Sequence, residues 1–240
     1  MMTTRFIRSL SLGALAVAAS ATQAAPLANG DFAQQLDGWQ HAGDVATTGT
    51  SPLPLGLGAG AWAVLGTAST QYVDDIGATQ PGGFNLSGHD VLGAQGPLES
   101  NLGLDANALN DDLLGRYALE GSALWQSFDV AQGDTLHINW QLLSRGTAGQ
   151  GDQADTAWVV WQLAGQTQLI RLGDTGSLET AQSSSTGWLS LGPARFSLSA
   201  SQSGRATLGF LVADINSYDT TSVLAVQGVA VTPAVPEPAS

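Results

Sequence analysis

The sequence predicts an all-β fold, a single antiparallel β-sandwich of the jelly-roll type with about nine or ten strands. Apolar and polar residues alternate with a period of two in several segments after residue 123, as in strands with one buried face. Turns rich in Gly, Asn and Asp separate these segments at a spacing typical of sandwiches. The 240 residues include no cysteine, so one hydrophobic core without disulfides must hold the chain together.

The first elements are two apolar anchors and two short strands. Asn29-Gly30 is a strong turn signal, and we expect Phe32 and Trp39 to tie the first strand into the core. A strand, a loop rich in Pro and Gly, and a second strand are predicted next, at 45–50, 51–60 and 61–65.

An irregular stretch and a short helix are expected in the following part of the chain. The stretch 76–97 is rich in Gly and contains Pro81 and Pro97. Leucines recur after it at roughly helical spacing, at Leu102, Leu109, Leu113 and Leu114. This spacing predicts a short surface helix around 102–114.

The β pattern is clearest after residue 123. Period-two segments on both sides of Gln132-Gly133-Asp134 predict a β-hairpin of 123–130 and 136–142. A turn at Gly165 separates the next two strands, and three more complete the set, at 156–163, 169–172, from 187, 205–213 and 222–232. One sandwich domain over 25–232 accounts for all of these strands.

The N-terminus has the pattern of a signal peptide over residues 1–24. Arg5 and Arg8 precede a short apolar stretch at 10–19, and Thr22 and Ala24 are small residues at the key positions of a cleavage site. We expect cleavage after Ala24, with Ala25 as the alternative, and no transmembrane segment in the mature chain.

The formal net charge of −13, with no lysine in the chain, restricts the partners. A surface of this charge repels phosphate backbones, so we expect no nucleic-acid partner. The acidity suits a soluble exported protein and also favours divalent cations.

The C-terminal residues 233–240 contain Val235-Pro236-Glu237-Pro238, followed by Ala239-Ser240. This run resembles the head of the PEP-CTERM sorting signal of exported Gram-negative proteins. In that family the motif precedes an apolar stretch and an arginine cluster, neither of which occurs up to Ser240. The resemblance implies sorting to the cell surface or outer envelope, with an exosortase-type system as partner. Simple secretion is the alternative.

The body of the chain also resembles proteins that carry this tail, through packing motifs in the segments 29–45, 121–136, 155–160, 208–214 and 222–229. Its opening, Asn29-Gly30-Asp31-Phe32, is similar to that of galactose-binding-like jelly rolls, which include many carbohydrate-binding modules. That resemblance implies a structural calcium ion, with Asn29 and Asp31 as the ligands. Ala33 and Gln227 stand where acidic residues would be common, and no other cofactor is implied.

No catalytic group is evident in the sequence, so we expect a protein that is not an enzyme. The carboxylate pairs Asp74-Asp75 and Asp111-Asp112 are adjacent residues in polar loops, and neighbouring residues in extended chain point apart. The histidines lie far apart and lack the spacing of metal ligands, at His41, His89 and His137. A Gly-x-Ser-x-Gly nucleophile motif is also absent.

Seven tryptophans are the more informative feature. Trp140 shares the phase of the apolar residues on its strand, which places it in the core. Trp158 and Trp161 have opposite parity on one strand, and Trp125 is out of phase with Leu124. Trp125 and one of Trp158 or Trp161 are therefore candidates for a carbohydrate-binding face. Packing of these rings under a loop or second layer is the favoured alternative.

Four acids sit in or near loops and could gather around a cation: Asp152, Asp155, Asp214 and Asp219. Because their spacing matches no dedicated calcium loop, we expect them to be solvated.

The preferred functional reading is a non-catalytic exported protein associated with the cell surface or with extracellular polysaccharide. A lectin-like carbohydrate-binding module is the alternative, and a secreted hydrolase is a distant third.

Overall fold

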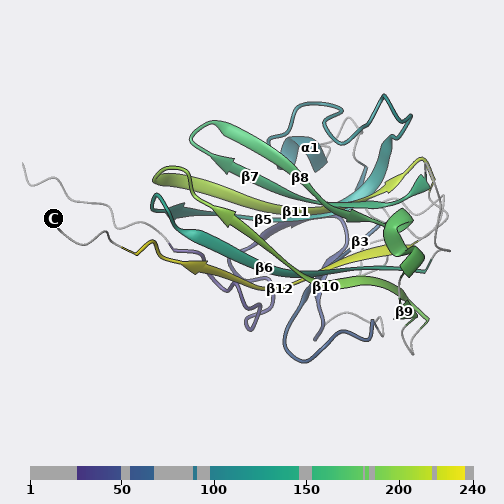
Figure 1. The fold of residues 1–240 in the computed structure, drawn as a ribbon, viewed down its shortest axis with the longest axis horizontal. Coiled ribbons are helices and arrows are strands. Elements are labelled where there is room, and N and C mark those ends of the chain that lie inside the picture. Colours follow the sequence, from purple (N-terminus) through teal and green to yellow (C-terminus); the bar gives the residue numbers. More distant parts are fainter. Residues whose placement is uncertain are drawn as a thin grey trace, which may run out of the picture.

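In the computed structural model, the described residues are 26–49, 55–67, 89–90, 98–145, 153–180, 182–183, 187–217 and 221–235. Within them, strands form two antiparallel sheets that pack face to face, which confirms the β-sandwich (Figure 1). Across the same ranges, the search for a helix long and apolar enough to cross a membrane finds none.

The first sheet has the strand order β1-β5-β11-β7-β8, with β4 beside β1 on the edge of β5. Its strands are β1 (Gln40–Ala42), β4 (His89–Asp90), β5 (Ala118–Val130), β7 (Thr156–Leu163), β8 (Gln166–Asp174) and β11 (Gly204–Ile215). A short helix, α1 (Leu98–Asn101), precedes β5, and a 3-10 helix, η3 (Thr175–Thr180), follows β8.

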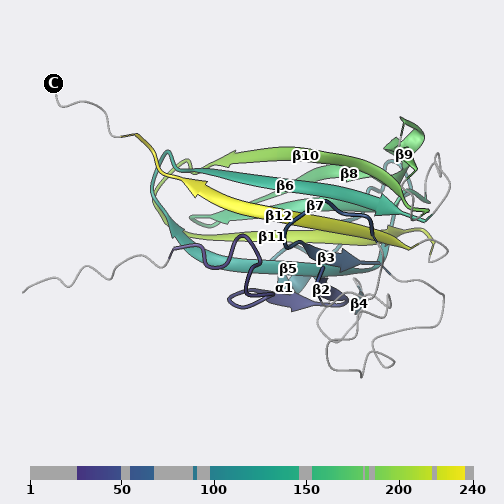
Figure 2. The same ribbon diagram turned by 90° about the horizontal axis from the view of Figure 1, so that it is seen from below.

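The second sheet has the order β2-β3-β12-β6-β10-β9, and Figure 2 shows β12, β6 and β10 side by side. Its strands are β2 (Val45–Thr47), β3 (Ala63–Gly66), β6 (Thr135–Ser144), β9 (Gln182–Ser183), β10 (Leu189–Ser199) and β12 (Ser222–Thr232). All nine strands predicted from the sequence are present in the two sheets. The additional ones, β1, β4 and β9, have two or three residues each.

The predicted hairpin around Gly133 is wrong, because β5 and β6 belong to different sheets. The chain instead crosses from one layer to the other at this turn. Gly133 has a φ of 87°, and its N–H donates to the carbonyl of Ala200 at 2.9 Å. The apolar residues of β5 and β6 are buried in the same core. The alternation of apolar and polar residues is therefore the same for a connection between two sheets as for a hairpin.

The main core fills the space between the sheets. It contains Trp140 and Trp161, and the rings of Phe32 and Trp39 lie with centroids 5.3 Å apart at one side of it. The predictions for Trp140 and for the two anchors are therefore confirmed. Burial of such large apolar side chains supplies most of the stabilisation that a chain without disulfides needs.

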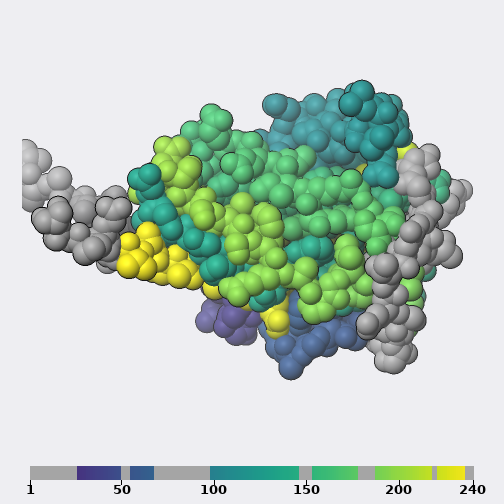
Figure 3. All heavy atoms as spheres, viewed as in Figure 1, coloured from purple at the N-terminus to yellow at the C-terminus, as the bar shows by residue number. Residues whose placement is uncertain are grey.

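Each sheet also has a covered outer face. Residues 98–109 pack on the first sheet, where Leu98, Leu102 and Leu109 are buried against β5, β7 and β11. Figure 3 shows this segment, in teal, standing above the green strands. Trp62 and Trp188 are buried on the outer face of the second sheet.

The predicted helix at 102–114 is wrong in place and length. The helix covers only Leu98–Asn101, and turns follow from residue 102 to residue 115. Leu102 and Leu109 are buried as amphipathic spacing requires, but Leu113 and Leu114 are 97% and 59% exposed. The second half of the pattern therefore has no apolar surface to pack against.

Candidate functional site

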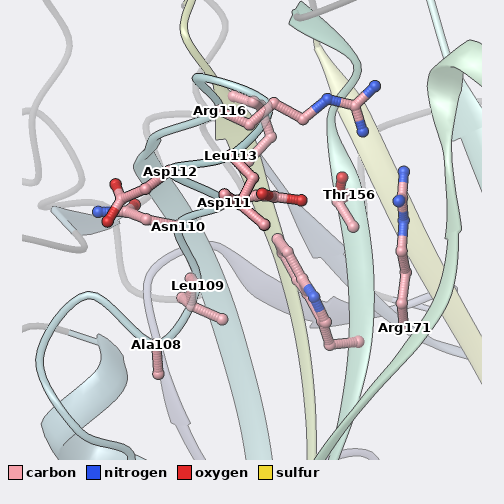
Figure 4. Close-up of a pocket in the computed structure, with 11 residues that line it drawn as sticks. Ala108, Leu109, Asn110, Asp111, Asp112, Leu113, Arg116, Thr156 and Arg171 are labelled. Atoms are coloured by element: carbon pink, nitrogen blue, oxygen red, sulfur yellow. The ribbon is translucent and has the colours of Figure 1, made fainter.

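A pocket of about 300 Å³ opens on the outer face of the first sheet, between β7, β8, the end of β11 and the segment 108–116 (Figure 4). Indole, guanidinium, amide, hydroxyl and carboxylate groups all line it. The lining residues are Ala108, Leu109, Asn110, Asp111, Asp112, Leu113, Arg116, Thr156, Trp158, Arg171 and Ile215.

The strands provide the floor of the pocket. Thr156 and Trp158 have the outward parity of β7, while the alternating residues Ala157 and Val159 face the main core. Trp158 pairs in register with Arg171 of β8, so the indole and the guanidinium come from neighbouring positions on one face. Trp158 is 7% exposed, which leaves little more than part of the ring open to the pocket.

The wall of the pocket depends on a buried carboxylate outside it. Glu99 of α1 is 2% exposed and accepts hydrogen bonds from the N–H groups of Asn107, at 2.7 Å, and Leu109, at 2.9 Å. Further along, Asp111 and Arg116 exchange backbone hydrogen bonds of 2.8 and 3.0 Å across a tight turn. These bonds fix a segment without regular secondary structure, so its polar side chains have defined positions.

Charges of both signs meet at the mouth of the pocket. Partial burial lowers the pKa of Arg171, the nearby charge of Arg116 lowers it further, and Asp111 opposes this. Arg171 also forms an ion pair with Asp174. The two guanidinium groups therefore repel each other and are balanced by carboxylates, which suits a ligand with hydrogen-bonding groups of both kinds.

The two pocket carboxylates do not converge. Figure 4 shows Asp111 pointing toward the strands and Asp112 pointing away from them. One oxygen of Asp111 accepts a hydrogen bond from the N–H of Leu114 at 3.2 Å. A glycoside hydrolase requires two carboxylates that face one another across the scissile bond. Asp111 and Asp112 diverge instead, as adjacent residues in extended chain do.

The structure separates the three tryptophans proposed from the sequence. Trp158 lines the pocket, and Trp125 lies on the same face of β5, half-buried against the cluster under residues 98–109. Trp161 is 3% exposed inside the main core, so its inclusion in a binding face is corrected. The opposite parity of Trp158 and Trp161 is confirmed, as is packing of the outer rings under a covering segment.

Of the polar residues that line the pocket, Asp111 and Asp112 were singled out from the sequence and the others were missed. Arg171 could have been found by counting back from the Gly165 turn, because the β7–β8 pairing places it opposite Trp158. Asn110 and Arg116 could not have been found in this way, since the long-range packing of residues 98–109 positions them.

The proposed calcium ligands lie in the first loop, away from the pocket residues. The side-chain N–H groups of Asn29 donate to the carbonyls of Gln35 and Asp37, both at 2.9 Å, and Asp31 is exposed. These bonds give Asn29 a role in shaping the loop. Calcium binding by Asn29 and Asp31 stays a prediction.

The remaining acids divide into two groups. Asp74, Asp75, Asp152 and Asp219 lie outside the described residues. Asp155 and Asp214 are 1% and 0% exposed, which corrects the expectation that they are solvated. They lie close enough for the charge of Asp155 to raise the pKa of Asp214. Within the described ranges, no group of three or more His, Cys, Asp or Glu residues is placed to hold a metal.

The chain has similarity to known proteins among solved structures. No family model matches the chain, and no curated protein matches it. Among solved structures, the chain is similar to TmCBM61, which was determined in complex with β-1,4-galactotriose. The match has 8% sequence identity and a TM-score of 0.42, and covers 87% of this chain and 98% of that one.

Proposed function

We propose that this protein is an exported, non-catalytic carbohydrate-binding β-sandwich, and that the pocket between β7, β8 and residues 108–116 takes the saccharide. The observation that carries the proposal is the combination of an indole floor with polar groups on the walls. Sugar rings present apolar C–H faces that pack on indole and hydroxyl groups that need both donors and acceptors.

The residues have distinct roles in this proposal. Trp158 provides the apolar surface, Arg171 and Arg116 donate hydrogen bonds, and Asp111 supplies an acceptor. Because the charges of Arg171 and Arg116 are balanced by the carboxylates of Asp174 and Asp111, the pocket favours a neutral saccharide over a strongly charged one.

Binding without hydrolysis is supported by the placement of the carboxylates. Asp111 and Asp112 diverge, and the pair that comes together, Asp155 and Asp214, is buried and does not line this pocket. The hydrolase alternative requires two acids at one glycosidic bond, one to protonate the leaving oxygen and one to act on the opposite side of the sugar carbon.

Export and sorting form the second part of the proposal, and they rest on the two chain ends. The signal-peptide pattern at 1–24 and the Val235-Pro236-Glu237-Pro238 motif support them. Where the chain leaves the sandwich after β12, Val235 is 89% exposed, which suits access by a processing enzyme (Figures 1 and 2).

Substitution of one pocket arginine tests the binding proposal. The purified protein is screened on a glycan array, and its affinity for the best neutral saccharide is then measured by calorimetry. We expect Arg171→Ala to weaken binding by about tenfold or more, because a hydrogen bond from a charged donor contributes about 1.5 kcal/mol or more.

The matched control is Arg195→Ala, an exposed arginine of β10 on the opposite sheet. This variant should retain full affinity. Equal losses in both variants, or an array on which no saccharide binds, would rule out this pocket. Release of new reducing ends during the incubation would instead favour the hydrolase.

Fractionation of the native host tests the sorting proposal. The mature protein should begin at Ala25 or Pro26 by mass spectrometry, and Glu237→Ala should change its distribution between envelope and medium. The genomic sequence after the Ser240 codon provides an independent check, since an apolar stretch followed by arginines belongs to the sorting signal.

A further inference from the structure

The inner face of the sandwich changes from apolar to polar at one end. At this end, six strands each contribute one inward-facing side chain to a single layer. All six side chains have hydroxyl or carboxyl groups, and each residue is at most 1% exposed. The layer continues the inward phase of β3, β5, β6, β7, β11 and β12 and consists of Thr67, Ser122, Ser144, Asp155, Asp214 and Ser222. It lies at the end of β12 opposite to that from which residues 233–235 leave (Figure 1).

Hydroxyl groups of the second sheet hold Asp155 from across the sandwich. The hydroxyl of Ser222 donates to Oδ2 of Asp155 at 2.5 Å, and the N–H of Ile215 donates to Oδ1 at 3.3 Å. Ser222 Oγ also lies 3.2 Å from the hydroxyl oxygen of Ser144. The backbone N–H of Ser222 donates to Thr67 Oγ1 at 3.0 Å. The layer is therefore an ordered set of oxygens that joins the two sheets.

Asp214 is the exception in this network. Neither of its carboxylate oxygens makes a hydrogen bond that meets the usual distance and angle limits among the described residues, although the side chains of Thr67 and Asp155 lie close enough to interact with it. It sits at a bulge in β11, beside Asp155 and Thr67, with Glu120 of β5 close enough to act on it electrostatically. Two neighbouring buried carboxyl groups are costly to ionise together, so the ionised pair requires a compensating charge.

No basic side chain supplies that compensation in the described part of the chain. The ion pairs found there are Arg171–Asp174 and Arg205–Asp129, and neither includes Asp155 or Asp214. The arginine next to this layer in sequence, Arg145, stacks its guanidinium on Trp188, 4.8 Å from the ring centroid. The chain contains no lysine that could fill this role.

We propose that this layer binds a calcium ion, with the carboxylates of Asp155 and Asp214 as charged ligands and the hydroxyls of Thr67 and Ser222 as neutral ones. Calcium takes oxygen ligands of mixed kind in irregular geometry, which is the donor set present here. Binding neutralises both acids and coordinates the oxygens of Asp214, which make no well-formed hydrogen bond among the described residues. The site joins β7 and β11 of the first sheet to the strand end at Thr67 and to β12 of the second.

Thermal unfolding with and without calcium tests the proposal. We expect 1 mM calcium chloride to raise the Tm of the EDTA-treated chain by about 5 °C, since a ligand that binds only the folded state stabilises it. Calorimetric titration of the same protein should give one calcium ion per chain. No saccharide is needed, so the result is independent of the carbohydrate-binding proposal.

Asp214→Asn and Asp31→Asn form the matched pair of variants. Asp214→Asn should lose the calcium-dependent rise in Tm, yet remain at least as stable as the wild type in EDTA, because it removes one of two neighbouring acids. Asp31→Asn, which changes the first loop, should keep the full rise. Asp155→Asn repeats the test if Asp214→Asn does not fold.

Two results would overturn the proposal. If the rise is lost in Asp31→Asn and kept in Asp214→Asn, the ion binds in the first loop. If calcium gives neither heat nor a change in Tm in the wild type, Asp155 and Asp214 compensate each other by sharing a proton.

Discussion

Glu99 organises the pocket wall although it does not line the pocket. Its two oxygens accept the N–H groups of Asn107 and Leu109 in a buried position. Glu99→Ala should lower the free energy of unfolding by about 2 kcal/mol or more, because two backbone donors lose their partners. Urea unfolding checks this, with the exposed Asp105→Ala as a control that should change the stability by less than about 0.5 kcal/mol. Equal effects of the two substitutions would contradict this role for Glu99.

The acids Asp155 and Asp214 make the calcium-free protein sensitive to pH. Burial raises the pKa of Asp155 to about 7, and burial followed by the charge of Asp155 raises the pKa of Asp214. The folded state therefore binds more protons than the unfolded state above about pH 4, so stability falls as the pH rises from 4 to 7.

We expect Asp214→Asn to flatten this fall when both proteins are unfolded in EDTA across that range. The difference should amount to a few kcal/mol at most, since one pKa unit corresponds to about 1.4 kcal/mol. His41, whose pKa is lowered by burial, acts in the opposite direction in both proteins and cancels. Parallel pH profiles for the two proteins would contradict the assignment.

Residue parity gave the sidedness of several of these side chains in advance. The alternation of inward and outward positions separates Trp158 from Trp161. Continued along β11 from Val212 to Asp214, it also places Asp214 on the inner face. The expectation that Asp214 is solvated was wrong because Asp214 continues the alternation of β11 and does not belong to the loop that follows. The neighbours of Asp214, which include Asp155 and Thr67, could not be predicted, since they come from strands far away in sequence.

Among the strands and loops, the segment 98–116 determines whether the pocket exists. Leu102 is 1% exposed and fixes this segment to the first sheet, whereas Leu113 is 97% exposed at the pocket rim. Leu102→Ala should cost about 2–5 kcal/mol of stability and weaken saccharide binding, as expected for a buried leucine. Chemical unfolding checks this against Leu113→Ala, which should leave the stability unchanged. A Leu102→Ala variant as stable as the wild type would show that the segment is not held by this contact.

The two errors in the predicted elements have the same physical origin. The leucine spacing at 102–114 and the alternation around Gly133 report correctly which side chains are buried, at Leu102, Leu109, Phe128 and Ile138. They do not report what covers those side chains. The carboxylate of Glu99 holds residues 107–109 in place of a helix, and β6 pairs in the opposite sheet instead of forming a hairpin with β5. The second arrangement depends on contacts distant in sequence.

Taken as a whole, the molecule uses its tryptophans for packing on three levels. Trp39, Trp140 and Trp161 lie between the sheets, Trp125 and Trp158 under residues 98–109, and Trp62 and Trp188 on the outer face of the second sheet. The fold class followed from composition and periodicity because these are averages over many residues. The pocket did not, since one covering segment creates it.

Hydrogen–deuterium exchange with and without the saccharide selected on the array tests the carbohydrate-binding proposal most directly. If the pocket binds it, amides in 108–116 and in the β7–β8 hairpin should exchange more slowly in the complex, while those of β6 and β10 stay unchanged. Slower exchange confined to the second sheet, or no change anywhere, would contradict the proposed site.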